Sequence, residues 1–208
     1  MKQVVIIMLL IIPSIAFAQQ VGFSLGTTIQ NLSYTNSDGV KADQLKGLPA
    51  ASISFSYLYA LQTKGSFNNS VMGQVGYKGG HLKDKGSHLL TTWSMNFLSA
   101  SAHFISQKNS KRKANPFFGA GIVSDFLISG TQNRGFEQYD LTNDLKTLNL
   151  SAKILTGLSY SISKESSCSL DLSYMRGFRN MEKSAEQSAM LHAWQLSATL
   201  FFQLKKIK

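Results

Sequence analysis

The chain has few residues of the kinds that define several common protein classes. Only 3 of its 208 residues are proline and only one, Cys168, is cysteine. A collagen-like repeat is therefore excluded, and so are an intramolecular disulfide and any zinc or iron–sulfur site built from several cysteines. Charged residues make up only 15% of the chain and aromatic residues make up 11%. This balance argues against a disordered chain and against a coiled coil.

Long apolar runs are also scarce. The run from Val4 to Ile12 (VVIIMLLII) is too short to span a bilayer, which takes about 20 residues. It follows Lys2 and precedes Ala16-Phe17-Ala18, an order typical of a secretory signal with a small-residue cleavage site. We predict a signal peptide over residues 1–18, cut between Ala18 and Gln19, and one mature domain over residues 19–208. The alternative is an uncleaved anchor or a buried N-terminal helix.

The rest of the chain alternates between apolar and polar residues with a period of two. In the segment 52–61, the large residues Ile53, Phe55, Tyr57, Tyr59 and Leu61 alternate with smaller ones. A helix would scatter these five side chains around its axis, whereas a strand places them on one face. Eight segments follow this pattern, and we predict a strand in each: 21–30, 52–61, 71–78, 90–105, 117–128, 150–163, 168–174 and 194–204.

The composition of the two strand faces distinguishes between β folds. A soluble sandwich would show charged residues to water, but here the polar face is mostly Ser, Gly, Thr and Gln, which fit the crowded interior of a narrow barrel. The apolar face carries the aromatic residues typical of a membrane boundary: Tyr57, Tyr59, Tyr77, Trp93, Tyr160, Tyr174 and Trp194. We therefore predict an all-β, eight-stranded antiparallel up-and-down transmembrane β-barrel in the cell outer membrane. The alternative is a soluble sandwich or a lipocalin-like barrel.

Two details of this prediction concern the fourth segment and the connections. Trp93, Met95 and Phe97 share the apolar face, and we expect a bulge over Ser99–Ala102, where the alternation weakens. With the N-terminus in the periplasm, the outer connections would span 35–47, 79–89, 130–146 and 177–188. All four are longer than the inner ones over 62–66, 107–114 and 164–166, as in outer-membrane barrels.

Two stretches of the sequence resemble a known family. An alternating strand (SMNFLSASAHFI), a basic turn (SQKNSKRKAN) and Pro116-Phe-Phe-Gly-Ala-Gly follow one another over residues 94–121, and Leu170–Asn180 reads LDLSYMRGFRN. These motifs, in this order, resemble the PorT-like outer-membrane β-barrel family of Bacteroidota over essentially the whole mature chain. The resemblance implies a cell-envelope barrel and, for some members, a link to the type IX secretion apparatus.

Polar residues on the inner face would line the lumen. We predict lumen-facing positions for Gln74, Lys78, Asp125, Lys153, Asp171 and Gln195. Unpaired charges are costly in a narrow lumen with little water, so we expect the two lysines to pair with the two aspartates and close the barrel. The alternative is a conduction path.

A basic cluster is the clearest candidate for partner binding. Lys108, Lys111, Arg112 and Lys113 fall in one predicted periplasmic turn. Taken alone, the cluster favours nucleic acid or anionic lipid. In a secreted barrel we interpret it as a turn near the head groups of the outer-membrane lipid, or as a docking surface for a periplasmic or secretion-system protein, and we predict no nucleic-acid partner.

Candidate residues for catalysis are scattered. His81, His88, His103 and His192 show neither metal-ligand spacing nor a His-x-Ser pair, so we predict no enzyme, no metal and no cofactor. Cys168 lies near a strand end on the outward face and is interpreted as a lipid-facing structural residue or, alternatively, as half of an intermolecular disulfide. The predicted function is a structural or interaction role through loops or turns. The alternative is a small transport or ligand-binding barrel.

Overall fold

The computed structural model describes residues 20–35, 39, 45–61, 66–84, 91–108, 113–183 and 187–204. The predicted signal peptide and its cleavage site at Ala18 and Gln19 lie outside these residues. No helix in the described ranges is long and apolar enough to cross a membrane. The strands are β1 (Gln20–Thr35), β2 (Leu45–Ala60), β3 (Phe67–Asp84), β4 (Thr91–Lys108), β5 (Ala114–Arg134), β6 (Glu137–Asp140), β7 (Leu148–Ser161), β8 (Ser166–Gly177) and β9 (Ser188–Gln203).

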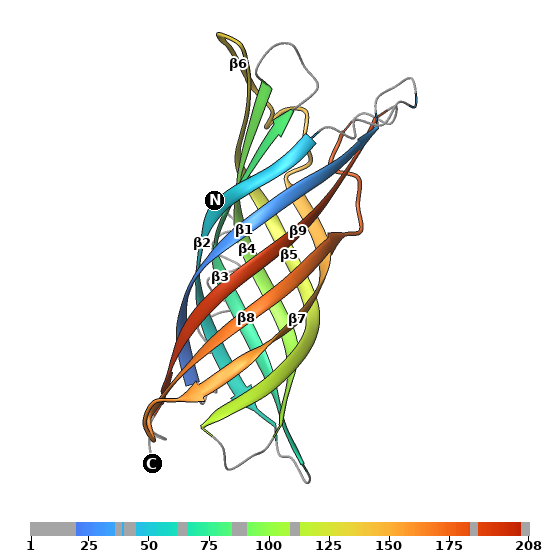
Figure 1. Ribbon diagram of the computed structural model, residues 1–208. Helices are drawn as coiled ribbons and strands as arrows, with labels where there is room; N and C mark the ends of the chain where they lie inside the picture. The colour runs from blue at the N-terminus through green and yellow to red at the C-terminus, as the bar shows by residue number, and fades with distance from the viewer. Residues whose placement is uncertain are drawn as a thin grey trace.

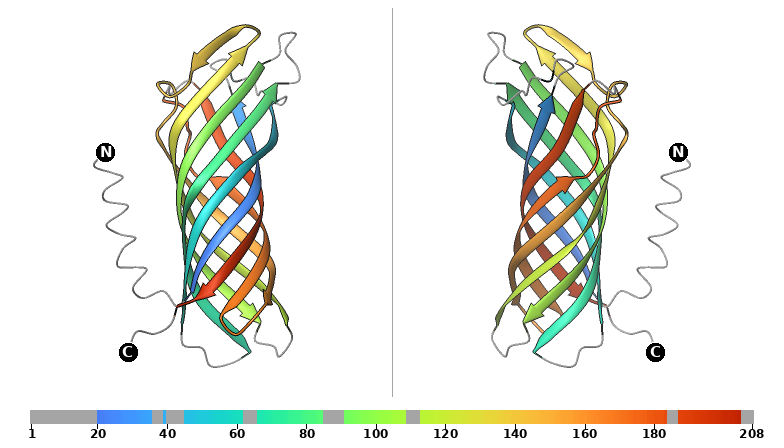
Figure 2. Two further views of the ribbon diagram at one scale, coloured as in Figure 1. Left: turned by 90° about the vertical axis from the view of Figure 1, so that its left-hand side faces the viewer. Right: turned by 90° about the vertical axis from the view of Figure 1, so that its right-hand side faces the viewer.

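Eight strands close into a ring in which every neighbouring pair is antiparallel (Figure 1). The order is β1–β2–β3–β4–β5–β7–β8–β9, and β9 returns to pair with β1 from Gln20↔Gln203 to Thr35↔Ser188. The antiparallel ring of eight strands predicted from the period of two is therefore confirmed. The short strand β6 pairs only with the end of β5, and this hairpin projects beyond the ring (Figure 2).

The two ends of the barrel differ in their connections. At the short-turn end, the strands are joined over residues 61–66, 109–113 and 162–165, and β1 starts there and β9 ends there. At the opposite, long-connection end, they are joined over 36–44, 85–90, 135–147 and 178–187. The outer connection 85–90 has the same length as the inner connection 61–66, so the prediction that every outer connection is longer than the inner ones was wrong there. Residues 79–84 continue β3 instead, because backbone pairing with β4 up to Asp84↔Thr91 does not need an apolar sequence.

The outer face of the barrel is apolar over its middle. The large side chains there expose 39–61% of their surface. They are Phe23, Leu25, Ile53, Phe55, Phe104, Phe118, Ile122, Ile154, Leu158, Leu170, Leu172, Leu196 and Leu200. The residues between them are small, polar and buried inside, among them Ser24, Ser56, Ser151, Ser169, Ser173 and Ser197. This is the reverse of a soluble protein, where the apolar face is hidden, and it is the pattern of barrels that face lipid.

The prediction for the fourth segment was wrong. Met95 and Phe97 are 0% exposed and lie inside the barrel, and Trp93 is partly buried against the same apolar residues, because the interior at this level is itself apolar. No bulge occurs over Ser99–Ala102, since β4 keeps one phase and pairs with β3 residue by residue. The register shifts instead between Asn96 and Phe97 against β5, where Ile128 is the extra residue.

Candidate functional site

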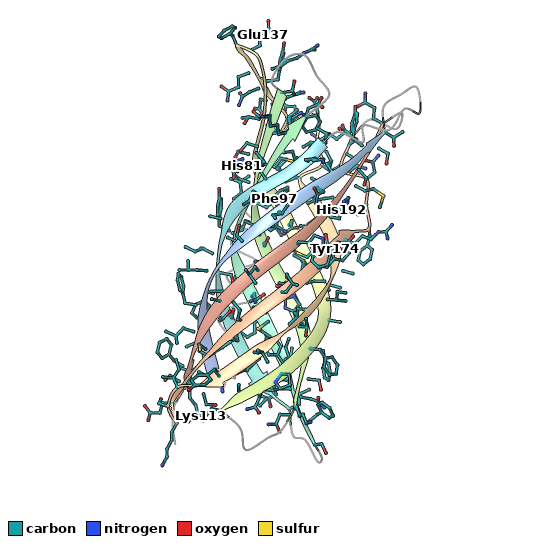
Figure 3. All side chains as sticks on the ribbon, viewed as in Figure 1. His81, Phe97, Lys113, Glu137, Tyr174 and His192 are labelled. Carbon is teal, nitrogen blue, oxygen red and sulfur yellow. The ribbon has the colours of Figure 1, made fainter. Side chains whose placement is uncertain are left out.

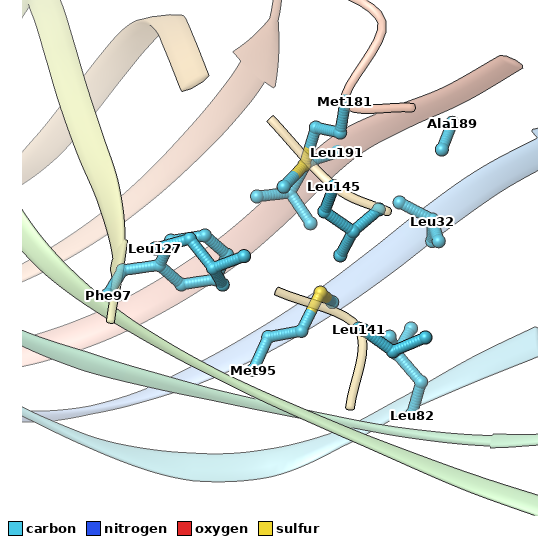
Figure 4. Packing of buried hydrophobic residues seen from close by; sticks show 10 residues of the cluster. All are labelled: Leu32, Leu82, Met95, Phe97, Leu127, Leu141, Leu145, Met181, Ala189 and Leu191. Carbon is cyan, nitrogen blue, oxygen red and sulfur yellow. The ribbon is translucent and has the colours of Figure 1, made fainter. Parts of the chain in front are cut away.

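The long-connection end of the interior is filled by an apolar cluster, here called the plug (Figure 4). It consists of Leu32, Leu82, Met95, Phe97, Leu127, Leu141, Leu145, Met181, Ala189 and Leu191. Most of these residues lie on strands, but Leu141, Leu145 and Met181 come from the connections 135–147 and 178–187, which fold back into the mouth of the barrel. Close packing of this kind leaves few voids larger than a water molecule.

Backbone hydrogen bonds hold these two connections over the mouth. The amide of Lys146 donates to the carbonyl of Met181 at 2.6 Å, and the amide of Met181 donates to the carbonyl of Ala189 in β9 at 2.8 Å. The side-chain oxygen of Asn180 accepts from the amides of Glu182, at 3.0 Å, and Ala189, at 2.7 Å. The connections are thus tied to each other and to the barrel wall.

A carboxyl group lies beside the plug. Glu182 is buried, with 7% of its surface exposed. Burial raises the pKa of Glu182, the negative charge of Asp144 raises it further, and Lys146 opposes the shift. Glu182 therefore takes up a proton more readily than an exposed glutamate, which reduces the negative charge held next to apolar side chains.

Below the plug, a buried ion pair crosses the interior. Lys78 Nζ lies 2.7 Å from Asp125 Oδ2, and the two side chains are 5% and 1% exposed. The hydroxyl of Ser99 also donates to Asp125. Lys78 Nζ lies 3.8 Å from the sulfur of Met175 and 5.8 Å from the ring centroid of Phe97, so its charge is compensated on several sides.

The second pair of charges is arranged differently. Lys153 Nζ donates to Gln195 Oε1 at 3.4 Å, and Gln195 Nε2 donates to Ser52 Oγ at 3.2 Å. Within the described residues, Lys153 and Asp171 interact electrostatically but form no ion pair within 4.0 Å. The expectation that both lysines contact aspartates across the lumen was therefore wrong for Lys153, because the amide of Gln195 lies closer. We call Lys78, Asp125, Lys153 and Asp171 the charge layer.

Toward the short-turn end the interior opens into a cavity of about 210 Å³. Six apolar residues form a collar inside it: Leu58, Met72, Ile105, Phe117, Leu155 and Phe201. Asp171 and Gln74 line it beside the charge layer, and Gln74 donates to Ser56 at 3.0 Å. This collar was not predicted from the sequence, because each of its residues falls singly in the inward phase of a different strand.

The predicted basic turn lies at the short-turn end. Lys108 ends β4 and is exposed, and Lys113, which is labelled in Figure 3, precedes β5 and is exposed. Lys111 and Arg112 lie outside the described residues. The two described lysines therefore flank one short connection, on the opposite end of the barrel from Glu137 and the β5–β6 hairpin.

The histidines do not gather into one site. His81 Nδ1 lies 3.0 Å from Ser94 Oγ, His103 is 1% exposed inside the barrel, and His192 lies on β9. His88 is outside the described residues. In the part of the chain that the structure describes, no three His, Cys, Asp or Glu side chains are placed to hold a metal, and Cys168 is a half-buried free thiol.

Comparisons with known proteins agree with this architecture. Neither a family model nor a curated protein matches the chain. Among solved structures, the outer membrane protein OprG from Pseudomonas aeruginosa superposes with a TM-score of 0.54 at 12% identity, covering 90% of this chain and 97% of that one. The outer membrane protein AlkL superposes with a TM-score of 0.50 at 13% identity, covering 92% and 93%.

A third neighbour bears on catalysis. The outer membrane protease OmpT from Escherichia coli superposes with a TM-score of 0.53 at 8% identity, covering 89% of this chain and 96% of that one. Identities this low establish the fold alone, which is that of outer-membrane β-barrels. Because one neighbour is a protease, the fold does not separate enzymes from barrels without catalytic activity.

The buried ion pair gives a direct test of what holds the interior together. In Lys78→Met, Asp125 keeps its charge without a cation, so we expect the free energy of unfolding to fall by about 3–5 kcal/mol. Guanidinium unfolding in lipid vesicles measures this.

Two further variants serve as controls. The double variant Lys78→Met/Asp125→Leu removes both charges and should recover most of the loss. Lys153→Ala should cost less than Lys78→Met, because Asp171 borders the cavity. Equal destabilisation in Lys78→Met and the double variant would contradict this account of the pair.

Proposed function

We propose that this chain is an outer-membrane β-barrel with a closed interior, which acts as a structural or interaction protein and not as a pore. The observation that carries the proposal is the plug, in which Leu141, Leu145 and Met181 from the connections fill the mouth of the barrel. The ion pair of Lys78 and Asp125 adds a second obstruction beneath it. An eight-stranded barrel has an interior just wide enough to be filled by side chains in this way.

The membrane location is supported by the outer face and by the neighbours. A band of large apolar side chains around the whole barrel would be an aggregation hazard in water, but it matches the hydrocarbon core of a bilayer. The rings of Tyr174 and Trp194 pack at a tilt of 47° with centroids 4.9 Å apart, and such residues favour the membrane boundary. OprG, AlkL and OmpT are all named as outer membrane proteins.

We further propose that the short-turn end faces the periplasm. Outer-membrane barrels have short periplasmic turns and longer outer loops. The β5–β6 hairpin would then project outward with exposed Phe136 and Tyr139, and Phe178 would lie on a neighbouring connection. Exposed aromatic residues are typical anchors for a protein partner.

The partner proposed for the periplasmic side is a cell-envelope protein of the secretion apparatus. Two features support this finer proposal. Lys108 and Lys113 are exposed on one short connection, and the motifs at residues 94–121 and 170–180 resemble the PorT-like family of Bacteroidota. A positive patch on a short turn would attract an acidic surface or lipid head groups. The scattered histidines favour this binding role over catalysis.

Location and orientation can be tested together. We expect the protein in the membrane fraction, released by detergent and not by high salt, because the apolar band must leave water. In a Cys168→Ser background, Phe136→Cys should react with an impermeant maleimide on intact cells, while Lys113→Cys should react only after the outer membrane is permeabilised. Full recovery in the soluble periplasm would overturn the proposal, and the reverse labelling pattern would overturn the orientation.

The outer face can be tested by single substitutions. Leu172 and Leu196 are paired across β8 and β9, and each exposes 46% of its surface. We expect Leu172→Arg and Leu196→Arg each to reduce the free energy of folding into lipid vesicles by about 2–4 kcal/mol near the bilayer midplane. The control is Ser173→Ala on the inner face, which should stay close to the parent. Equal losses on both faces would refute the assignment of the faces.

The closed interior predicts the absence of conductance. Purified protein in planar bilayers should show no steady open channel, because the plug and the charge layer leave no continuous water column. A porin recorded under the same conditions serves as the control for insertion. Stable, size-selective conductance would instead favour the transport alternative.

A further inference from the structure

The cavity at the short-turn end has no part in closing the barrel. Toward the long-connection end the interior is occupied mainly by the plug and the charge layer, where a space of about 40 Å³ remains beside Lys78 and Lys153, whereas this region keeps about 210 Å³ inside the collar. Its inner part is apolar, with Met72, Ile105, Leu155 and Phe201 buried together. A packed interior normally has few voids larger than a water molecule, so a cavity of this size, open at the short-turn end, has room for a ligand.

One carboxylate, at the inner end of the cavity, indicates where the polar group of a ligand would lie. Asp171 lines the cavity, and it is the lining residue of β8 farthest from the short-turn end. Among the described residues its carboxylate accepts no hydrogen bond, since Lys153 is bonded to Gln195 and Ser169 and Ser173 on either side make no bond to it. Because Asp171 faces the cavity without a protein donor, a ligand that carries a donor could take the place of water at its carboxylate.

The charges in the interior indicate which kind of hydrogen-bond donor the ligand carries. The charge layer contains two lysines and two aspartates, so it is neutral as it stands. An ammonium ligand beside Asp171 would leave one uncompensated positive charge in an interior that already holds Lys153 and Lys78. A hydroxyl or amide donor would satisfy Asp171 without that penalty.

The size of the cavity limits the ligand. An apolar cavity of about 150 Å³ binds benzene, so the space of about 210 Å³, only part of which lies against the apolar collar, suits a ring with a short polar substituent. The way in is polar, because Gln20, Gln107 and Gln203 line the cavity at the short-turn end. A ligand with one polar group could therefore approach from water and bury its apolar part in the collar.

We infer that the cavity is a binding site for a small uncharged amphiphile, whose apolar body packs in the collar and whose hydroxyl or amide group donates to Asp171. The ligand enters from the short-turn end and is held there, because the charge layer and the plug block the way through. This inference goes beyond the proposed structural role and does not depend on a protein partner. A barrel closed at one end would act as a receptor or carrier site and not as a channel.

Methionine positions allow a test that reports where a ligand binds. Met72 lies in the collar, whereas Met95 and Met181 lie in the plug. We would label the methionine methyl groups with carbon-13, place the full barrel in lipid nanodiscs, and titrate benzyl alcohol, toluene and protonated benzylamine, which are close in size. Benzyl alcohol should shift the Met72 resonance saturably and leave Met95 and Met181 unshifted, while the other two bind about tenfold or more weakly.

Two variants separate the polar and apolar parts of the site. Asp171→Ala should weaken the binding of benzyl alcohol to about the affinity of toluene, because the hydrogen-bond acceptor is removed. Ser159→Phe fills the cavity from β7 and should abolish the Met72 shift. Its matched control is Leu158→Phe on the outer face of the same strand, which should bind like the parent. If Ser159→Phe fails to fold, the Asp171→Ala result decides.

Three outcomes would overturn the inference. Equal shifts of all methionines would mean partition into the bilayer only. Toluene binding as tightly as benzyl alcohol would remove the role of Asp171, and tighter binding of benzylamine would reverse the charge argument. The closed interior is tested separately by conductance, so a failure here leaves that proposal intact.

Discussion

The pairing of β9 with β1 is the constraint on which the rest of this structure depends. It joins the first and last described strands over sixteen residue pairs, from Gln20↔Gln203 to Thr35↔Ser188, and so removes the two free edges of the sheet. In the bilayer that we propose, an unpaired edge would leave backbone amides and carbonyls without partners, at several kcal/mol each. Closure is therefore what allows an apolar outer face and a polar inner face to exist in one thin wall.

Closure with eight strands also sets the problem that the interior must solve. The lumen is narrow, and its content changes along its length. Apolar side chains pack in the plug, compensated charges lie in the middle, and the apolar collar at the short-turn end is only partly filled. The ion pair of Lys78 and Asp125 can be buried because Ser99, Met175 and Phe97 surround it. The collar instead keeps open space, and this is where we place the ligand site.

Some of the interior could be predicted from the sequence, and some could not. In the strict alternation over residues 150–163, Lys153 falls on the opposite face of the strand from Ile154. Its inward direction therefore follows from local geometry. The contact between Lys153 and Gln195 joins strands that are far apart in the sequence and depends on the register of the closed ring. The same alternation misled for Met95 and Phe97, because apolar residues suit both the outer face and an apolar plug.

The sequence by itself determined the number of ring strands, their antiparallel order and the polarity of the two faces, because a period of two is a local property of an extended chain. Only the tertiary structure decided what meets inside. The connections that carry Leu145 and Met181 fold into the mouth, and the collar residues, each from a different strand, converge only once the sheet has closed. Such contacts depend on barrel tilt and register, which no local pattern of residues specifies.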